Sequence, residues 1–84
     1  MDYADILVGR IGELCRQRGI SQNRLAAMSG IRQSTVNNIF AGMSKNPRIQ
    51  TLHKIANALG MTLAEFLDVE ELNAYSFADQ DDED

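Results

Sequence analysis

The sequence of 84 residues predicts an all-α fold, a compact domain of five short helices. Apolar residues recur three to four positions apart along most of the chain, and no segment alternates between apolar and polar residues as a half-buried strand does. Four glycines, at positions 19, 30, 42 and 60, each follow one of these helical segments. Glycine is favoured directly after a helix because it adopts the left-handed backbone conformation without a Cβ clash.

The first four helices are each defined by an apolar stripe. Ser21 is a good N-cap for the second helix. Gly9 and Gly12 fall inside the first helix and weaken it by about 1 kcal/mol each relative to alanine, which close packing against a neighbour would explain. In chain order, the four stripes are Ile6, Leu7, Ile11, Leu14 and Cys15; Leu25, Ala26 and Met28; Val36, Ile39 and Phe40; and Ile49, Leu52, Ile55, Ala56 and Leu59.

The fifth helix begins after Thr62, with Glu65 at capping-box spacing, and carries Phe66, Leu67 and Leu72. Beyond residue 72 the apolar pattern decays into an acidic stretch. Like charges repel there, and little apolar surface is present to offset the entropy of ordering. We therefore expect a folded domain over residues 1–72 and a disordered acidic tail over residues 73–84.

Positive charge is concentrated in one part of the chain, although the net charge is −4. All eight basic residues lie between positions 10 and 54, and Glu13 is the one acid in that stretch, which leaves it a local charge of +7. Five acids crowd into residues 79–84. Screening limits the reach of a charge to about 10 Å at ordinary salt, so the basic stretch governs the attraction of a polyanion.

Composition argues against several classes of protein. One cysteine allows no intrachain disulfide. The chain has neither a membrane-spanning apolar run nor the basic start of a signal peptide, so we expect a cytoplasmic protein without a membrane partner. Cys15 and His53 alone cannot form a zinc site. Because no nucleophile–base pair or phosphate loop is visible, we expect neither enzymatic activity nor a cofactor.

Residues 22–39 fit two helices that cross steeply through a very short turn. Ala26 is small where the second of these helices passes over it, Gly30 makes the turn, and Ile31 fills the space beneath it. Apolar residues occupy the remaining inward positions of the pair: Leu25, Val36 and Ile39.

This segment resembles the helix-turn-helix of the Cro/phage-repressor family, also called the xenobiotic-response-element type. The resemblance runs from about residue 6 to residue 67 and includes the Asn46-Pro47-Arg48 loop and the run 52–60. It implies a lambda-repressor-like domain with the second and third helices as the helix-turn-helix. The implied function is a sequence-specific double-stranded DNA-binding transcriptional regulator, a repressor, acting as a homodimer. Arg32 and Arg48 depart from the family pattern, because family members often have a better helix-capping residue at these two positions.

The resemblance also implies that the third helix enters the major groove and meets base edges with its first residues. The amides of Gln33 and Asn38 match N6 and N7 of adenine, and Arg32 matches guanine or a phosphate. The candidate base-reading residues are Arg32, Gln33, Ser34, Thr35, Asn37 and Asn38. The candidate phosphate-binding residues are Gln22, at the start of the second helix, and Lys45, Asn46 and Arg48, in the loop that the family lays along the DNA backbone.

An alternative function is that of an antitoxin or a protein–protein adaptor whose acidic tail engages a protein partner. The same tail could instead compete with DNA for the basic face. The apolar residues after the fifth helix are the candidates for self-association: Leu67, Val69, Leu72, Tyr75 and Phe77.

Overall fold

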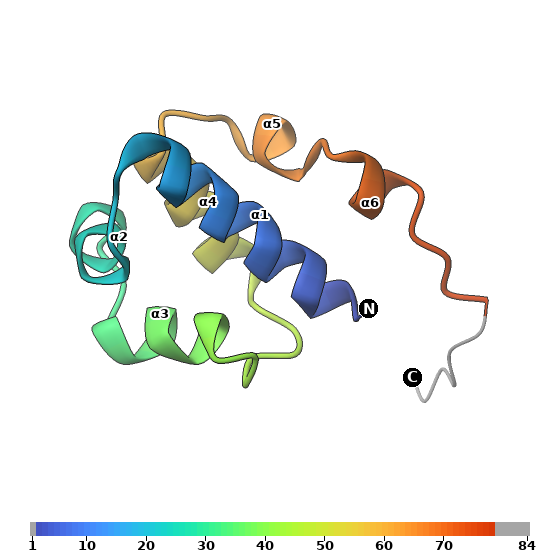
Figure 1. The fold of residues 1–84 in the computed structure, drawn as a ribbon, viewed down its shortest axis with the longest axis horizontal. Helices are drawn as coiled ribbons and strands as arrows, with labels where there is room; N and C mark the ends of the chain where they lie inside the picture. The colour runs from blue at the N-terminus through green and yellow to red at the C-terminus, as the bar shows by residue number, and fades with distance from the viewer. Residues whose placement is uncertain (1, 79–84) are drawn as a thin grey trace.

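Six α-helices follow one another in the computed structural model of the chain, which describes residues 2–78. No strand occurs among these residues, which confirms the all-α prediction. Figure 1 shows α1 passing in front of α4, with α3 on one side of this pair and α5 on the other. The helices are α1 (Tyr3–Arg18), α2 (Gln22–Ser29), α3 (Gln33–Phe40), α4 (Ile49–Ala58), α5 (Leu63–Leu67) and α6 (Glu70–Asn73).

The predicted fifth helix is divided into two. α5 ends at Leu67, and Asp68 and Val69 leave the helical conformation with φ, ψ of −83°, 76° and −130°, 148°. The break satisfies its own backbone, because the N–H of Val69 donates to Leu67 O (2.9 Å) and the N–H of Asn73 donates to Val69 O (2.9 Å). Leu67 and Leu72 both pack against the core from their separate helices. The predicted domain boundary, after residue 72, falls inside α6, and the acidic residues 79–84 lie outside the described residues.

The core is apolar throughout the described part of the chain. Its largest fully buried side chains are Phe66, Ile11, Leu25, Ile39, Ile55 and Val36, which come from α1 to α5. Two predicted core residues are instead exposed: Met28 (41% exposed) and Ile49 (59% exposed). Each lies in the terminal turn of its helix. Apolar spacing identifies the inward face of a helix, but it does not show where the covering neighbour ends.

The glycine-marked ends of the first four helices form as predicted. All four glycines after helices have positive φ, between +64° and +76°. At Gly30 the glycine N–H donates to Ala27 O (3.4 Å) and the N–H of Ile31 donates to Ala26 O (3.1 Å), the paired bonds of a Schellman motif. The capping box at α5 is also present, and the backbone N–H and side chain of Thr62 together hold the pKa of the Glu65 carboxyl below its ordinary value.

Gly9 has no packing role within the described residues, because a Cβ added there would meet nothing within 4 Å. We expect Gly9→Ala to raise the free energy of unfolding by about 0.5–1 kcal/mol, since alanine restricts the unfolded chain and favours the helix. The matched control is Gly30→Ala, where the space is equally open but φ is +68°. That variant should lose about 1–2 kcal/mol to backbone strain. Urea denaturation of both measures the contrast, and destabilisation by Gly9→Ala would show that α1 needs this glycine.

Candidate nucleic-acid interface

α3 separates an apolar inner side from a polar outer side. Val36 and Ile39 are 1% and 2% exposed and belong to the core. Five of the six candidate base-reading residues are exposed, and Thr35 is half-buried. The exposed five are Arg32, Gln33, Ser34, Asn37 and Asn38.

The turn between α2 and α3 holds this polar side outward. Ala26 and Leu25 are buried where the two helices meet, and Ile31 packs against the core from the turn, as the sequence predicts. Ser29 Oγ donates to Leu25 O (2.6 Å). Figure 1 shows α2 nearly end-on while α3 lies across the view, so the helices cross at a steep angle. α3 is thus fixed through its buried side, and its outer side needs no protein contact.

Polar side chains at the start of α3 are partly ordered before any ligand binds. Gln33 Nε2 donates to Asn37 Oδ1 (3.0 Å), which links two candidate base-reading amides one helical turn apart. Arg32 is the N-cap residue and makes no side-chain cap, as expected for a guanidinium, which has no acceptor. The amino end of α3 therefore keeps its partial positive charge beside an arginine.

A hollow of about 320 Å³ joins α3 to the loop before α4. It places Thr35 beside the candidate phosphate-binding residues Asn46 and Arg48. Ser44 and Thr51, which both carry a hydroxyl group, also line the hollow. They were not among the candidate residues, because no local sequence pattern distinguishes them. The full lining is Thr35, Ile39, Ser44, Asn46, Pro47, Arg48 and Thr51.

The other two candidate phosphate-binding residues do not line this hollow. Lys45 Nζ lies 3.4 Å from the carboxylate of Asp2, and both side chains are mostly exposed. An exposed ion pair stabilises a protein by less than about 1 kcal/mol, so a phosphate can displace the carboxylate. Gln22 is the first residue of α2 and is exposed, directly after Ser21, whose Oγ accepts a hydrogen bond from the N–H of Arg24 (3.1 Å).

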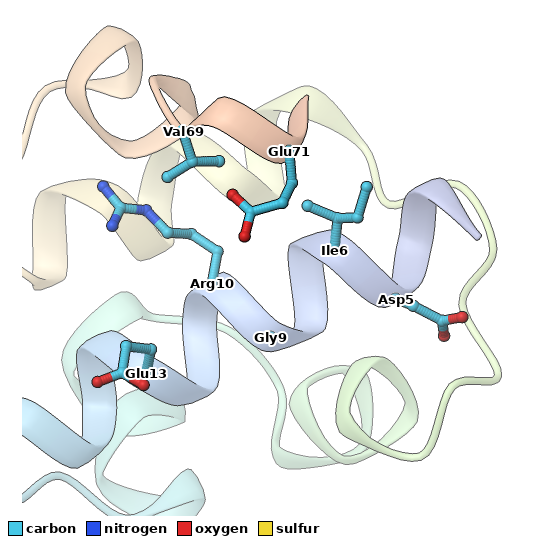
Figure 2. Close-up of a pocket in the computed structure, with 7 residues that line it drawn as sticks. All are labelled: Asp5, Ile6, Gly9, Arg10, Glu13, Val69 and Glu71. Carbon is cyan, nitrogen blue, oxygen red and sulfur yellow. The ribbon is translucent and has the colours of Figure 1, made fainter. Parts of the chain in front are cut away.

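Arg10 does not line this hollow either. It lies on α1 and faces α5 and α6. Its Nε donates to Phe66 O (2.9 Å) and its Nη2 donates to Glu65 O (3.1 Å). Figure 2 shows its side chain extending along a hollow of about 380 Å³ between α1 and α6, with Val69 and Glu71 opposite. Arg10 therefore satisfies carbonyls at the end of α5, and no sequence pattern predicts this because the partners are more than 50 residues away.

We expect Arg10→Ala to lower the free energy of unfolding by about 1 kcal/mol, because partly exposed charged hydrogen bonds to two carbonyls are lost. Duplex affinity should change little. Arg16→Ala is the control, because Arg16 is exposed and its ion pair is with Glu13, an exposed residue of the same helix. Thermal melts of both variants measure the change in stability, and duplex titrations measure the change in affinity. A large affinity loss in Arg10→Ala without loss of stability would place Arg10 in the interface instead.

The one cysteine and the one histidine of the chain, Cys15 and His53, lie in different environments. Burial raises the pKa of the Cys15 thiol, against a smaller lowering effect of Arg18, so the thiol stays protonated. Cys15 is a core residue, as its place in the apolar stripe of the first helix predicts, and His53 is exposed. No cluster of three metal-ligating side chains occurs in the described range. None of the helices in residues 2–78 meets the length and hydropathy that a membrane span needs.

Known proteins share this arrangement. Residues 11–66 match the profile of the family described as Helix-turn-helix. The chain belongs to the Cro/phage-repressor type of that family. This confirms the resemblance found in the sequence. The crystal structure of the prophage Lp1 protein 11 superposes on this helix-turn-helix chain with a TM-score of 0.78 at 35% identity, covering 87% of this chain and 97% of that one.

Several curated relatives of this helix-turn-helix protein are described as HTH-type transcriptional regulators. SlrR of Bacillus subtilis is 40% identical over 65 residues, which are 76% of this chain and 43% of SlrR. PuuR of Escherichia coli is 37% identical over 57 residues, 68% of this chain and 30% of PuuR. The uncharacterized regulator y4dJ of Sinorhizobium fredii is 30% identical over 67 residues, 80% of this chain and 86% of y4dJ. The match thus spans less than half of SlrR and PuuR but most of y4dJ.

Proposed function

We propose that this protein is a sequence-specific, double-stranded DNA-binding transcriptional regulator that reads the major groove with α3. The observation that carries the proposal is the exposed polar side of α3, backed by buried Val36 and Ile39. Residues 14–64, which include α2, α3 and α4, contain no aspartate or glutamate. A segment without acids of its own favours close approach to a polyanion.

In this proposal the two sets of residues have different tasks. Side chains at the start of α3 meet base edges, and the residues around the loop before α4 meet phosphates. Contacts to base edges carry sequence information, whereas contacts to phosphates supply salt-dependent affinity and fix the register. Occupation of an operator by such a domain blocks other proteins, so we propose a repressor.

Family membership also supports a homodimer on a two-fold operator. Of the residues singled out for self-association, Leu67 and Leu72 pack on the core, Val69 and Tyr75 are half-buried, and Phe77 is exposed. A selection from random duplexes, followed by sizing of the complex, tests specificity and stoichiometry together. Recovery of no preferred sequence would contradict the proposal.

Arg48→Ala tests the phosphate contacts. Because Arg48 is exposed at the N-cap of α4 and makes no side-chain cap, its loss should leave the fold intact. We expect weaker binding on every duplex to a similar extent, and a salt slope reduced by about one ion. The slope comes from affinities at several salt concentrations, with Arg16→Ala as the charge-matched control. A loss confined to one sequence would instead assign Arg48 to base reading.

A further inference from the structure

Two exposed amide side chains are paired on the outer side of α3. Gln33 is the first residue of this helix, and its Nε2 donates to Oδ1 of Asn37, one turn further along, at 3.0 Å. Such a bond between side chains four positions apart favours one arrangement of both of them on a helix. Val36 and Ile39, which are fully buried, hold the helix from its other side. The carboxamide of Gln33 is therefore oriented before any ligand binds.

The hydrogen bond limits what the Gln33 carboxamide can offer to a ligand. A glutamine amide has two N–H donors and one carbonyl oxygen that accepts. Asn37 takes one of the two donors, so one donor and one acceptor remain for a base.

The two purines differ in what they ask of such an amide. In the major groove an adenine edge presents one acceptor, N7, and one donor, N6, whereas a guanine edge presents two acceptors, N7 and O6. The groups of Gln33 that stay free match adenine. On guanine they would leave one acceptor without a partner, and an unpaired polar group in an interface is unfavourable.

We propose that Asn37 is a positioning residue that makes Gln33 select adenine over guanine, and that Asn37 itself reads no base. The inference rests on the proposed DNA binding through α3. Asn37, one of the candidate base-reading residues, then acts through Gln33. Without its acceptor, both N–H groups of Gln33 can turn toward the two acceptors of guanine. Discrimination between the two purines falls, although an amide remains to bind either of them.

The test removes the acceptor and keeps the reader. Gln33→Ala first identifies the base pair that Gln33 reads, as the position where preference is lost. Affinities of Asn37→Ala are then measured by fluorescence anisotropy for the selected duplex and for one with guanine in place of adenine at that position. We expect the parent protein to favour adenine by about tenfold or more, and Asn37→Ala to lose about three- to tenfold of this ratio. Preferences at the other positions should be kept.

Two further variants separate positioning from reading and from a role in helix stability. Asn37→Asp keeps an acceptor and adds a negative charge, so it should bind both duplexes more weakly and retain the parent ratio of adenine to guanine. Asn38→Ala removes the neighbouring exposed amide of the same helix. It should change the preference at a different base pair and also retain this ratio. A residue that only stabilises α3 would leave the ratio unchanged in all three variants.

Spectra of the free protein test the pairing itself. The side-chain NH₂ signals of Gln33 in ¹H–¹⁵N spectra should move further in Asn37→Ala than in Asn38→Ala, because only the first variant removes the acceptor of their hydrogen bond.

An unchanged ratio of adenine to guanine in Asn37→Ala would overturn the inference and leave the proposed function intact. A selected base other than adenine at the position of Gln33 would do the same, and so would a preference lost by Asn37→Ala at another base pair, since Asn37 would then be a reader. If the parent protein prefers no duplex, the proposed function fails, and the inference fails with it.

Discussion

Replacing Gln33 by alanine is expected to weaken binding to the selected duplex by about 1–3 kcal/mol and to relax base preference at one position. The physical reason is that a glutamine amide makes two hydrogen bonds to an adenine edge, and alanine makes none. Gln33 is exposed, and its one side-chain partner in the described structure is Asn37, also exposed. Helicity and thermal stability should therefore stay close to those of the parent protein. Asn38→Ala should act in the same way at a different position.

The measurement is a competition between the selected duplex and duplexes altered at single positions. Asn57→Ala, which removes an exposed amide from α4, is the matched control and should leave every preference unchanged. An equal loss on all duplexes would show that Gln33 supplies affinity without reading a base. The same pair of outcomes separates a reading role from a phosphate-contacting role at each of the other candidate positions of α3.

Replacing Phe66 by alanine is expected to lower the free energy of unfolding by about 3–5 kcal/mol. Phe66 is fully buried and is among the largest of the fully buried side chains. A chain of 84 residues has a total stability of only about 4–12 kcal/mol. The substitution thus removes a large part of it, and the midpoint of thermal unfolding should fall by about 15–30 °C.

Met43→Ala is the control for this substitution, because the side chain of Met43 is 72% exposed. Its free energy of unfolding should stay within about 0.5 kcal/mol of the parent value. Circular dichroism during urea and thermal denaturation measures both variants. If Phe66→Ala unfolds near the parent midpoint, then α5 contributes little to the core, and the helix-turn-helix is stable without it.

The relation between local pattern and structure is clearest at the helix ends. Gly30 and Thr62 act through hydrogen bonds to residues three to five positions away, so their roles are readable from spacing. The buried positions of α3 follow from its 3.6-residue period for the same reason. The interruption at Asp68 was not predicted, because the residues on both sides keep apolar side chains that pack on the core.

The positions of two basic side chains depend on contacts between distant segments. Arg10 belongs to the basic stretch in the sequence, yet it bonds to carbonyls of α5. The position of Lys45 in its loop makes it a candidate phosphate-binding residue, but the sequence does not predict its pairing with Asp2. Side chains this long can point toward several neighbours, and only the packing of the helices selects one.

The sequence by itself determined the helical class, the glycine-marked ends of the first four helices and the polar side of α3, because each depends on spacing within one or two turns. The tertiary structure alone decided that Arg10 bonds to carbonyls of α5 and that Lys45 pairs with Asp2. It also decided that the residues after α6 return to the ring of Tyr3. These outcomes depend on how separate helices pack, and the free energy of that packing is shared among residues far apart in the chain.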